Sequence, residues 1–398
     1  MPDDFIKETP EHGELESILR TCVHCGFCNA TCPTYQLTGN ELDGPRGRVY
    51  LLKQVLEGQP VSRITQQHLD RCLTCRSCET TCPSGVRYGR LLDAGRVIVD
   101  ARVGRTLGEQ LTRGLIKTIF PYRRRFGGLL RAARYIKPLL PFALGKKIPA
   151  QQRAEIWPAT DHARKMLILP GCVQPTLAPS IDRAAARVLD KLGISLIPIE
   201  AGGCCGALHY HLSDHHRALM LARENIDACR PYIEQGAEAI VMTASGCGVM
   251  FKDYGELLKH DDLYAEKAAR FSALAKDIAE IVAAEDVTVF KADNRKVAFH
   301  SPCTLQHGQQ ITGMVEALLK NAGYPLTAVA DGHLCCGSAG VYSLLQPDWS
   351  RQLLKNKLQA LEAGQPDIIA TANIGCLSHL QTAGSLKIVH WIELLDNQ

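Results

Sequence analysis

Between residue 165 and the end of the chain, apolar runs that predict buried strands alternate with segments that predict amphipathic helices. The run KMLILPGCV (165–173) predicts a strand, IDRAAARVLDKLG (181–193) a helix and ISLIPIE (194–200) a second strand. A helix over 217–233 and the strand AEAIVMTASGCG (237–248) complete the unit. Strands that alternate with helices form parallel sheets, so an α/β fold is expected here.

The same order of elements is predicted a second time. It runs VAFHSPC (297–303), MVEALLKNAG (314–323), YPLTAVAD (324–331), SRQLLKNKLQALEAG (350–364) and DIIATANIGC (367–376). In both copies cysteines follow the predicted strands, where ligand-binding residues of open α/β sheets gather. They form two sets that differ by 131 residues at the first three positions and by 129 at the last: Cys172, Cys204, Cys205 and Cys247, then Cys303, Cys335, Cys336 and Cys376.

The N-terminal part has a different pattern, in which predicted helices separate two cysteine-dense loops. Apolar residues recur at helical spacing before Gly58, and the segment 90–104 predicts another helix. The loops are CVHCGFCNATCP (22–33) and CLTCRSCETTCP (72–83), with identical spacing and a shift of 50 residues. Together with the two later sets they account for all but one, Cys229, of the 17 cysteines in the 398 residues. Cys229 is expected to be a core residue.

Each loop has the spacing C-x2-C-x2-C-x3-C-P, which is the bacterial ferredoxin run. In that run three cysteines bind one [4Fe-4S] cluster and the fourth binds the other cluster, which explains why the loop occurs twice. The expected ligands are Cys22, Cys25, Cys28 and Cys82 for one cluster, and Cys72, Cys75, Cys78 and Cys32 for the other. Two structural zinc ions are the alternative.

Composition and charge narrow the class of protein. The net charge of +4 gives no argument for nucleic acid as a partner. The polar N-terminus predicts no signal peptide, and no apolar run reaches the ~18 residues that span a bilayer. Cysteines in such a chain indicate metal or redox chemistry rather than disulfides. No G-x-G-x-x-G or Walker motif follows a predicted strand, so no flavin is expected on this chain.

The adjacent cysteines of CCG could bind different irons of one cluster, with glycine allowing the close backbone approach. The eight cysteines of the two later sets are therefore candidates for a third iron–sulfur centre; buried, inert thiols are the alternative. His211 and His215, four residues apart, could bind metal, although a solvated helix start is the favoured interpretation.

Residues 110–150 contain ten lysines or arginines and no acidic residue. Within them Phe126, Leu129, Leu130, Ala133 and Ile136 predict one apolar helical face. Such a segment either contacts an anionic membrane surface or connects two domains and packs on its own protein, and the connector is slightly favoured.

Two ferredoxin runs followed by two CCG repeats resemble the iron–sulfur subunit of glycolate oxidase, also called glycolate dehydrogenase, over nearly the whole chain. The resemblance is strongest in the two loops and in TASGCG, CTLQH, HLCCGSAG and TANIGC. It implies an electron-transfer subunit with two [4Fe-4S] clusters. Such a subunit works with FAD-binding subunits, is not catalytic toward glycolate alone, and takes part in the oxidation of glycolate to glyoxylate by passing electrons toward a membrane quinone. It also implies a cytoplasmic location, peripheral on the cytoplasmic face of the inner membrane.

The implied fold is α+β/α/β: an N-terminal helical two-cluster ferredoxin domain (1–105), a basic helical connector (106–164), and two tandem CCG repeats with parallel sheets (165–290 and 291–398). CCG domains that hold a cluster typically end in CxxC, but Met250 and His379 stand at those positions here. His379 is a candidate replacement ligand. Two other functions share the layout: the iron–sulfur subunit of anaerobic glycerol-3-phosphate dehydrogenase, and a heterodisulfide-reductase-like catalytic subunit. A zinc-stabilised assembly module is a further, non-redox alternative.

Overall fold

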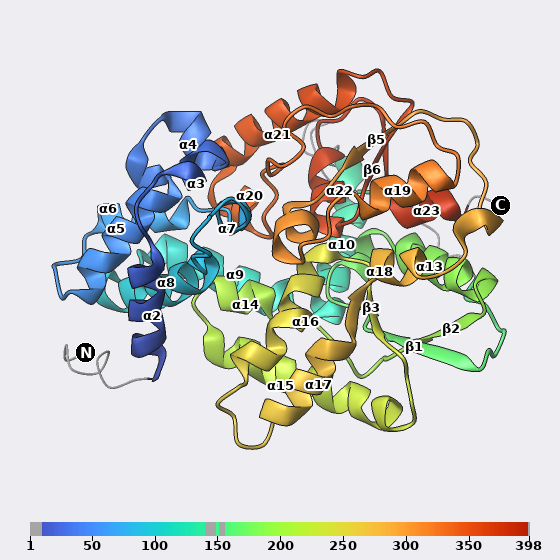
Figure 1. The fold of residues 1–398 in the computed structure, drawn as a ribbon, viewed down its shortest axis with the longest axis horizontal. Helices are drawn as coiled ribbons and strands as arrows, with labels where there is room; N and C mark the ends of the chain where they lie inside the picture. The colour runs from blue at the N-terminus through green and yellow to red at the C-terminus, as the bar shows by residue number, and fades with distance from the viewer. Residues whose placement is uncertain (1–9, 140–148, 151–155, 397–398) are drawn as a thin grey trace.

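The computed structural model describes residues 10–139, 149–150 and 156–396 (Figure 1). A helical N-terminal region lies to one side, and two α/β units, one after the other in the chain, form the rest (Figure 1). The expected fold class is therefore confirmed. No helix in these ranges is long and apolar enough to cross a membrane.

The N-terminal region is a set of helices around a small apolar core. Its elements are α2 (Pro10–Thr21), α3 (Phe27–Ala30), α4 (Pro33–Thr38), η1 (Glu41–Asp43), α5 (Pro45–Leu56), α6 (Arg63–Asp70), α7 (Ser77–Thr80) and α8 (Tyr88–Val103). The helices predicted before Gly58 and over 90–104 are thus confirmed. Leu52 of α5 and Leu91 of α8 are fully buried in this core. Gly95 lets the two helices approach, because a Cβ there would lie 2.2 Å from Leu52 Cδ2.

Two helices connect this region to the α/β units: α9 (Leu107–Ile119) and α10 (Arg123–Ile136), followed by η2 (Lys137–Leu139). Thr106 and Glu109 form a capping box that starts α9. Phe126 of α10 is buried and packs on Phe120, while Arg134 donates to the carbonyl of Thr176 in the first α/β unit. The predicted face of α10 is therefore only partly covered, since Leu129 and Ile136 remain exposed.

The first α/β unit contains a parallel four-stranded sheet in the order β2-β1-β3-β4. The strands are β1 (Arg164–Ile168), β2 (Ile194–Pro198), β3 (Ile240–Met242) and β4 (Ala275–Asp277). The helices are α12 (Gln174–Leu177), α13 (Ser180–Lys191), α14 (Ala207–His211), α15 (His215–Glu234), α16 (Ser245–Leu257), α17 (Ala265–Leu274) and α18 (Ile278–Ala283), and η3 (Val287–Val289) follows. The three predicted strands are confirmed, and β4 adds an edge that the sequence pattern did not predict.

The second unit contains a parallel sheet in the order β5-β6-β7. Its elements are β5 (Val297–His300), η4 (Thr304–Gly308), α19 (Met314–Asn321), α20 (Tyr342–Leu345), α21 (Pro347–Glu362), β6 (Ile368–Thr371), α22 (Ile374–Leu380), β7 (Lys387–His390) and α23 (Trp391–Leu395). The strand predicted over 324–331 is wrong: only an isolated bridge joins Leu326 to Val297. Pro325 has no N–H to donate to a ladder, which limits pairing there.

The two units pack on each other through a shared apolar core and a few buried polar contacts. His390 Nε2 lies 2.8 Å from the carbonyl oxygen of Thr243, and the N–H of Ser245 donates to the carbonyl of Ala372. Ser245 and Thr304 share a hydroxyl hydrogen bond of 2.7 Å. These contacts join residues that follow strands, so the cysteine-bearing ends of the two sheets lie near one another.

Candidate metal centres

The two cysteine-dense loops have the same backbone conformation. His24 and Gly26 of the first loop have positive φ angles of 52° and 84°, and Thr74 and Arg76 of the second have 52° and 58°. Each pair sits between the first three cysteines, where left-handed residues turn the chain sharply. The repeated spacing thus corresponds to a repeated loop structure.

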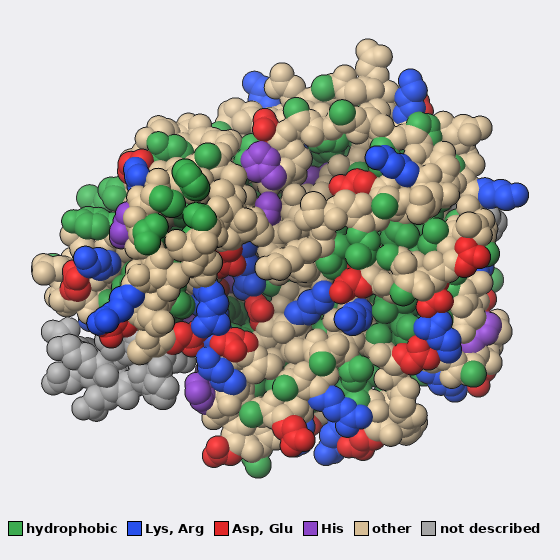
Figure 2. Space-filling view, viewed as in Figure 1, with side chains coloured by type: hydrophobic (Ala, Val, Ile, Leu, Met, Phe, Trp, Pro, Cys, Tyr) green, Lys and Arg blue, Asp and Glu red, His purple; other side chains and the backbone are tan. Residues whose placement is uncertain are grey.

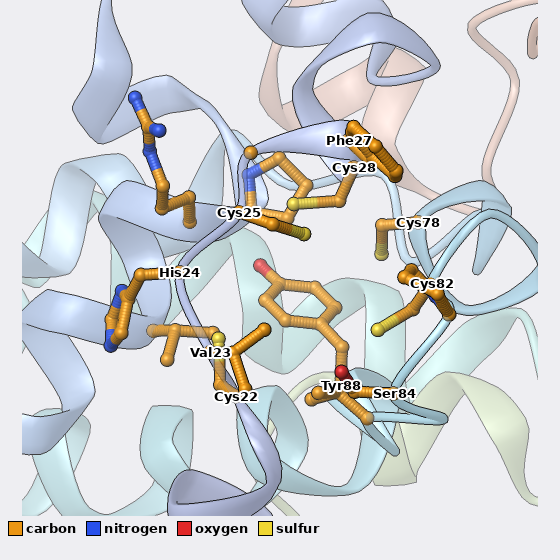
Figure 3. Close-up of a pocket in the computed structure, with 16 residues that line it drawn as sticks. Cys22, Val23, His24, Cys25, Phe27, Cys28, Cys78, Cys82, Ser84 and Tyr88 are labelled. Carbon is orange, nitrogen blue, oxygen red and sulfur yellow. The ribbon is translucent and has the colours of Figure 1, made fainter.

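The first loop and the end of the second line one cavity. Cys22, Cys25 and Cys28 come from the first loop, and Cys82 comes from the second. Figure 3 shows these four thiols around the ring of Tyr88, with a fifth, Cys78, between Cys28 and Cys82. This is the set that the spacing predicts for one cluster.

A second cavity has the converse composition. Cys72, Cys75 and Cys78 line it from the second loop, and Cys32, at the start of α4, lines it from the first. The chain therefore brings together both predicted sets of four, and Cys78 borders both cavities. The two cavities are adjacent because each loop contributes to both.

Burial and neighbouring thiols dominate the electrostatics of these cysteines. Burial, and then repulsion from Cys22, raises the pKa of Cys28 to about 11. Burial also raises the pKa values of Cys75 and Cys78 well above the ordinary range. Thiolates are the form that binds iron, so cluster binding would release protons. The positive charge of iron would then replace that of the protons.

A buried arginine that the sequence pattern did not single out lies beside the second cavity. Arg48 is 0% exposed, and its Nε donates to the carbonyl of His68 at 2.8 Å. Burial opposes its charge, but attraction to Cys72, Tyr88, Cys32 and Asp43 outweighs that effect and raises its pKa. Its guanidinium places a permanent positive charge next to ligands of only one of the two predicted clusters.

Each α/β unit also gathers its own four cysteines. Hydrogen bonding to Cys204, and then burial, raises the pKa of Cys172 well above its ordinary value, and Cys205 interacts with both Cys204 and Cys247. In the second unit Cys303 Sγ lies 3.8 Å from Cys335 Sγ, and Cys336 interacts with both Cys335 and Cys376. Both sets are rows of neighbouring thiols rather than scattered core residues.

The CCG turns have the conformation expected of them. Gly206 and Gly337 have φ angles of 90° and 88°, and their N–H groups each donate to a cysteine Sγ at 3.4 Å. A Cβ on Gly337 would lie 2.7 Å from the carbonyl oxygen of Ser350. Glycine is needed here both for the left-handed conformation and for this close approach.

The row of the second unit continues to a histidine that the sequence pattern did not identify. His300, the last residue of β5, is 1% exposed. A ring nitrogen of His300 and the sulfurs of Cys336 and Cys376 all lie within 4.8 Å of one another. The corresponding residue of the first unit, three positions before its first cysteine, is Leu169. Aligning the two repeats could have revealed this difference.

His379, at one of the two CxxC departures, belongs to no group of three close metal-ligating side chains in the described residues. Nε2 of His379 lies 3.1 Å from Ser350 Oγ, so the histidine has a protein partner. Met250 is buried in the apolar cluster that also contains Cys205 and Cys229. Of the two histidines, His300 and not His379 has cysteine sulfurs close to its ring in such a group, and Cys229 is a core residue as expected.

The paired histidines on α14 and α15 have other partners. Nδ1 of His211 lies 3.0 Å from Asp93 Oδ1, and the ring of His215 stacks on Tyr210 at 4.0 Å. Neither belongs to a group of three close metal-ligating side chains in the described residues. The expected solvated helix start holds only in part: His215 begins α15, but His211 ends α14, and both rings are partly buried against protein partners.

The N-terminal region packs against the cysteine row of the second unit. Leu73 and Cys75 of the second loop lie in one apolar cluster with Cys303, Cys335 and Tyr342. The hydroxyl of Tyr342 donates to the carbonyl of Arg71 at 3.2 Å. The second loop is thus the part of the N-terminal region nearest to the later cysteines.

The first α/β unit contacts the N-terminal region mainly through charges. Arg76 pairs with Asp253 at 2.8 Å and Lys259 with Glu14 at 3.2 Å. Figure 2 shows acidic and basic side chains alternating along this seam. The two α/β units therefore contact the helical region by different kinds of surface.

The comparisons with known proteins find a matching family model within each of these three parts of the chain. A family model described as "4Fe-4S dicluster domain" matches residues 18–86, and one described as "Cysteine-rich domain" matches 166–252 and 297–381. The chain is 54% identical over 96% of its length, and 95% of the relative's, to a glycolate oxidase iron-sulfur subunit of Escherichia coli. It is 29% identical over 98% of its length and 95% of the relative's to a probable glycolate oxidase iron-sulfur subunit of Bacillus subtilis. A lactate utilization protein A of Exiguobacterium is 27% identical over 56% of this chain and 94% of its own.

Proposed function

Because the chain belongs to the family of glycolate oxidase iron–sulfur subunits, we propose that it carries electrons from the flavin of a glycolate dehydrogenase complex toward a quinone. Glycolate is oxidised to glyoxylate on the flavoprotein, which takes two electrons and passes them on singly. The resemblance extends over 96% of the chain, so it includes both the dicluster domain and the cysteine-rich repeats.

The observation that carries the electron-transfer role is the pair of cavities lined by both loops. We assign Cys22, Cys25, Cys28 and Cys82 to one [4Fe-4S] cluster, and Cys72, Cys75, Cys78 and Cys32 to the other. When bound, such clusters accept and donate single electrons. The chain's own residues would hold the clusters adjacent, and they place the buried Arg48 beside the second one. This arrangement suits a path for electrons between partners.

A hydride acceptor is assigned to separate FAD-binding subunits. Oxidation of a hydroxy acid removes two electrons from one carbon, and iron–sulfur clusters take them only one at a time. The loops and rows of thiols in this chain have the chemistry of cluster ligands and not of a hydride acceptor. The chain therefore needs a flavoprotein partner for the proposed reaction.

We expect the purified chain, with its clusters intact, to show no dye-linked oxidation of glycolate. Adding the flavin-bearing subunits should restore activity and make the cluster signals reducible by glycolate. Stopped-flow absorbance and EPR under anaerobic conditions measure both effects. Glycolate oxidation by the flavin-free chain alone would contradict the assignment of the chemistry to a partner.

We also propose a peripheral contact with the cytoplasmic face of the inner membrane, made by the basic connector. Leu107, Leu111 and Leu115 of α9 follow one another at intervals of four residues and are 61–78% exposed. On the opposite side of α9, Ile116 is buried and Arg113 pairs with Asp70. An exposed leucine stripe on a helix with basic neighbours is typical of helices that lie in a membrane interface.

Of the three consecutive arginines at the start of α10, two have partners within the chain. Arg123 pairs with Glu200, and Arg125 donates to the carbonyl of Thr118 and lies over the ring of Tyr122. Arg124 and Arg131 are exposed. The leucines of α9 therefore supply the apolar part of the proposed contact, and these two arginines supply charge.

Vesicle binding tests this contact. The chain should sediment with vesicles that contain anionic lipid, and binding should weaken as salt rises. Replacing Leu111 and Leu115 with glutamine should reduce binding by about a hundredfold or more, because each buried leucine contributes roughly 1.5–3 kcal/mol and about 1.4 kcal/mol corresponds to a factor of ten. Leu263→Gln is the matched control, since Leu263 is 74% exposed but lies far along the chain. Equal binding to neutral vesicles, or no effect of the α9 changes, would leave this segment as a connector.

A further inference from the structure

His300 is a buried polar side chain whose hydrogen-bonding capacity is entirely unused. It is 1% exposed, and neither Nδ1 nor Nε2 has a hydrogen-bond partner. Leaving a buried polar group unpaired costs roughly 1–3 kcal/mol, so native proteins seldom retain one without a reason. A metal that takes the lone pair of one ring nitrogen would give that nitrogen a partner and remove part of this cost.

Two side chains close to His300 are themselves possible metal ligands. The sulfurs of Cys336 and Cys376 lie within 4.8 Å of the His300 ligand atom and of each other. Asn373 Nδ2 donates to Cys376 Sγ at 3.6 Å, which fixes that sulfur at the start of α22. Thiolate and imidazole together are a soft donor set that suits iron–sulfur centres or zinc.

We propose that His300 is a nitrogen ligand of an iron–sulfur centre in the second cysteine-rich repeat, beside Cys336 and Cys376, with Cys303 and Cys335 completing the row. The first repeat has Leu169 at the corresponding position, so it lacks a counterpart of this imidazole. The two repeats thus differ in chemistry although they share a fold. This inference rests on the proposed iron–sulfur role of the chain, and it does not depend on glycolate as the substrate.

The position of the row favours iron over zinc. Cys75, an assigned ligand of the second cubane, packs in the same apolar cluster as Cys303 and Cys335. Charge on Cys303 contributes, after burial, to the raised pKa of Cys75, which reflects how near the two sulfurs are. A reduced cubane could pass one electron directly to a centre at this place. Zinc has no accessible redox state and would end the path.

The imidazole would give this centre a higher reduction potential than thiolates alone. In Rieske centres, replacement of thiolate by histidine raises the reduction potential, because a neutral ligand leaves less negative charge on the cluster. The positive charge of Lys357 would also raise the reduction potential. Lys357 is 3% exposed, and burial lowers its pKa, but attraction to Cys335 and Cys336 partly offsets this effect. The second repeat is therefore the preferred destination of an electron that leaves the cubane held by Cys75.

Pulsed EPR on the anaerobically purified, dithionite-reduced chain tests this ligand. Iron should exceed the about eight atoms of two cubanes. The additional signal should show a strong ¹⁴N coupling that changes to ¹⁵N when only histidine is isotopically labelled. His300→Gln should remove that coupling, and His300→Cys should lower the potential of the centre. His379→Gln is the matched control and should leave both unchanged, because His379 bonds Ser350.

The labelling experiment uses the unaltered chain, so it decides on histidine ligation even if His300→Gln fails to fold. Iron near eight with stoichiometric zinc, a third signal without histidine nitrogen, or a coupling that survives in His300→Gln would each overturn the proposal. Absence of the two cubane signals would instead refute the proposed iron–sulfur role. The two failures are therefore distinguishable in one set of samples.

Discussion

Replacing Cys32 with serine should damage the cluster of the other loop, held by Cys72, Cys75 and Cys78, and leave the cluster of its own loop in place. Cys32 is 7% exposed and lines the second cavity with those three cysteines. Serine oxygen is a harder ligand than thiolate and binds iron in clusters less well. We expect loss of one of the two cubane EPR signals and of up to about four irons per chain.

The reciprocal change provides the control. Cys82→Ser removes a thiol from the first cavity, so it should damage the cluster of Cys22, Cys25 and Cys28 and spare the second. Cys229→Ser is a further control, because that buried thiol lies in the apolar core of the first repeat. If Cys32→Ser abolished the signal of its own loop's cluster and spared the other, the crossed assignment would be wrong.

Both variants should also reduce electron flow sharply. The proposed path passes through both clusters in turn, so loss of one would remove a step of that path rather than a fraction of its capacity. Transfer from glycolate-reduced flavoprotein to a quinone analogue should fall by orders of magnitude in either variant. Glycolate oxidation with an artificial dye that accepts electrons at the flavin should persist.

The cysteine pattern predicted the two groups of ligand candidates because duplication leaves a direct trace in sequence. A shift of 50 residues relates the two loops, and their backbone turns match residue for residue, from His24 and Gly26 to Thr74 and Arg76. Periodicity likewise located β1, β2 and β3, whose apolar runs are followed by cysteine or glycine. Local pattern was enough for these features.

Features set by packing between distant segments were missed. β4 (Ala275–Asp277) contains a lysine and an aspartate in three residues and joins the sheet only by pairing with β3. Arg48 resembles any surface arginine of a helix, and it is buried because α5 packs against α6 and α8. The contact of Cys75 with the Cys303 row depends on how the N-terminal region packs on the second repeat. No spacing along the chain encodes such contacts.

Replacing Arg48 with methionine should lower the reduction potential of the cluster held by Cys72, Cys75, Cys78 and Cys32. Reduction adds a negative charge, and the buried guanidinium stabilises that charge. A unit charge at separations of about 4–8 Å contributes roughly 2–4 kcal/mol at an effective dielectric constant of about 20. For a one-electron couple this corresponds to a decrease of roughly 80–170 mV. An EPR-monitored redox titration measures it.

Arg48→Met should change mainly the reduction potential of the cluster and not the stability of the fold. Asp43, 3.9 Å from Arg48, keeps His68 at 2.7 Å and Arg71 at 3.1 Å as partners, so the substitution does not leave a buried carboxylate alone. Arg48→Lys should retain most of the potential because the charge remains.

Arg46→Met is the matched control at the other cavity. Arg46 lines the first cavity and pairs with Glu41 at the surface. Solvent screens an exposed charge, so this change should cause a smaller shift, confined to the cluster of Cys22, Cys25, Cys28 and Cys82. An unchanged second potential in Arg48→Met, or equal shifts of both clusters, would show that the buried arginine does not distinguish them. A selective shift would mean that one charge, buried by the packing of α5, sets the order in which the two clusters are reduced.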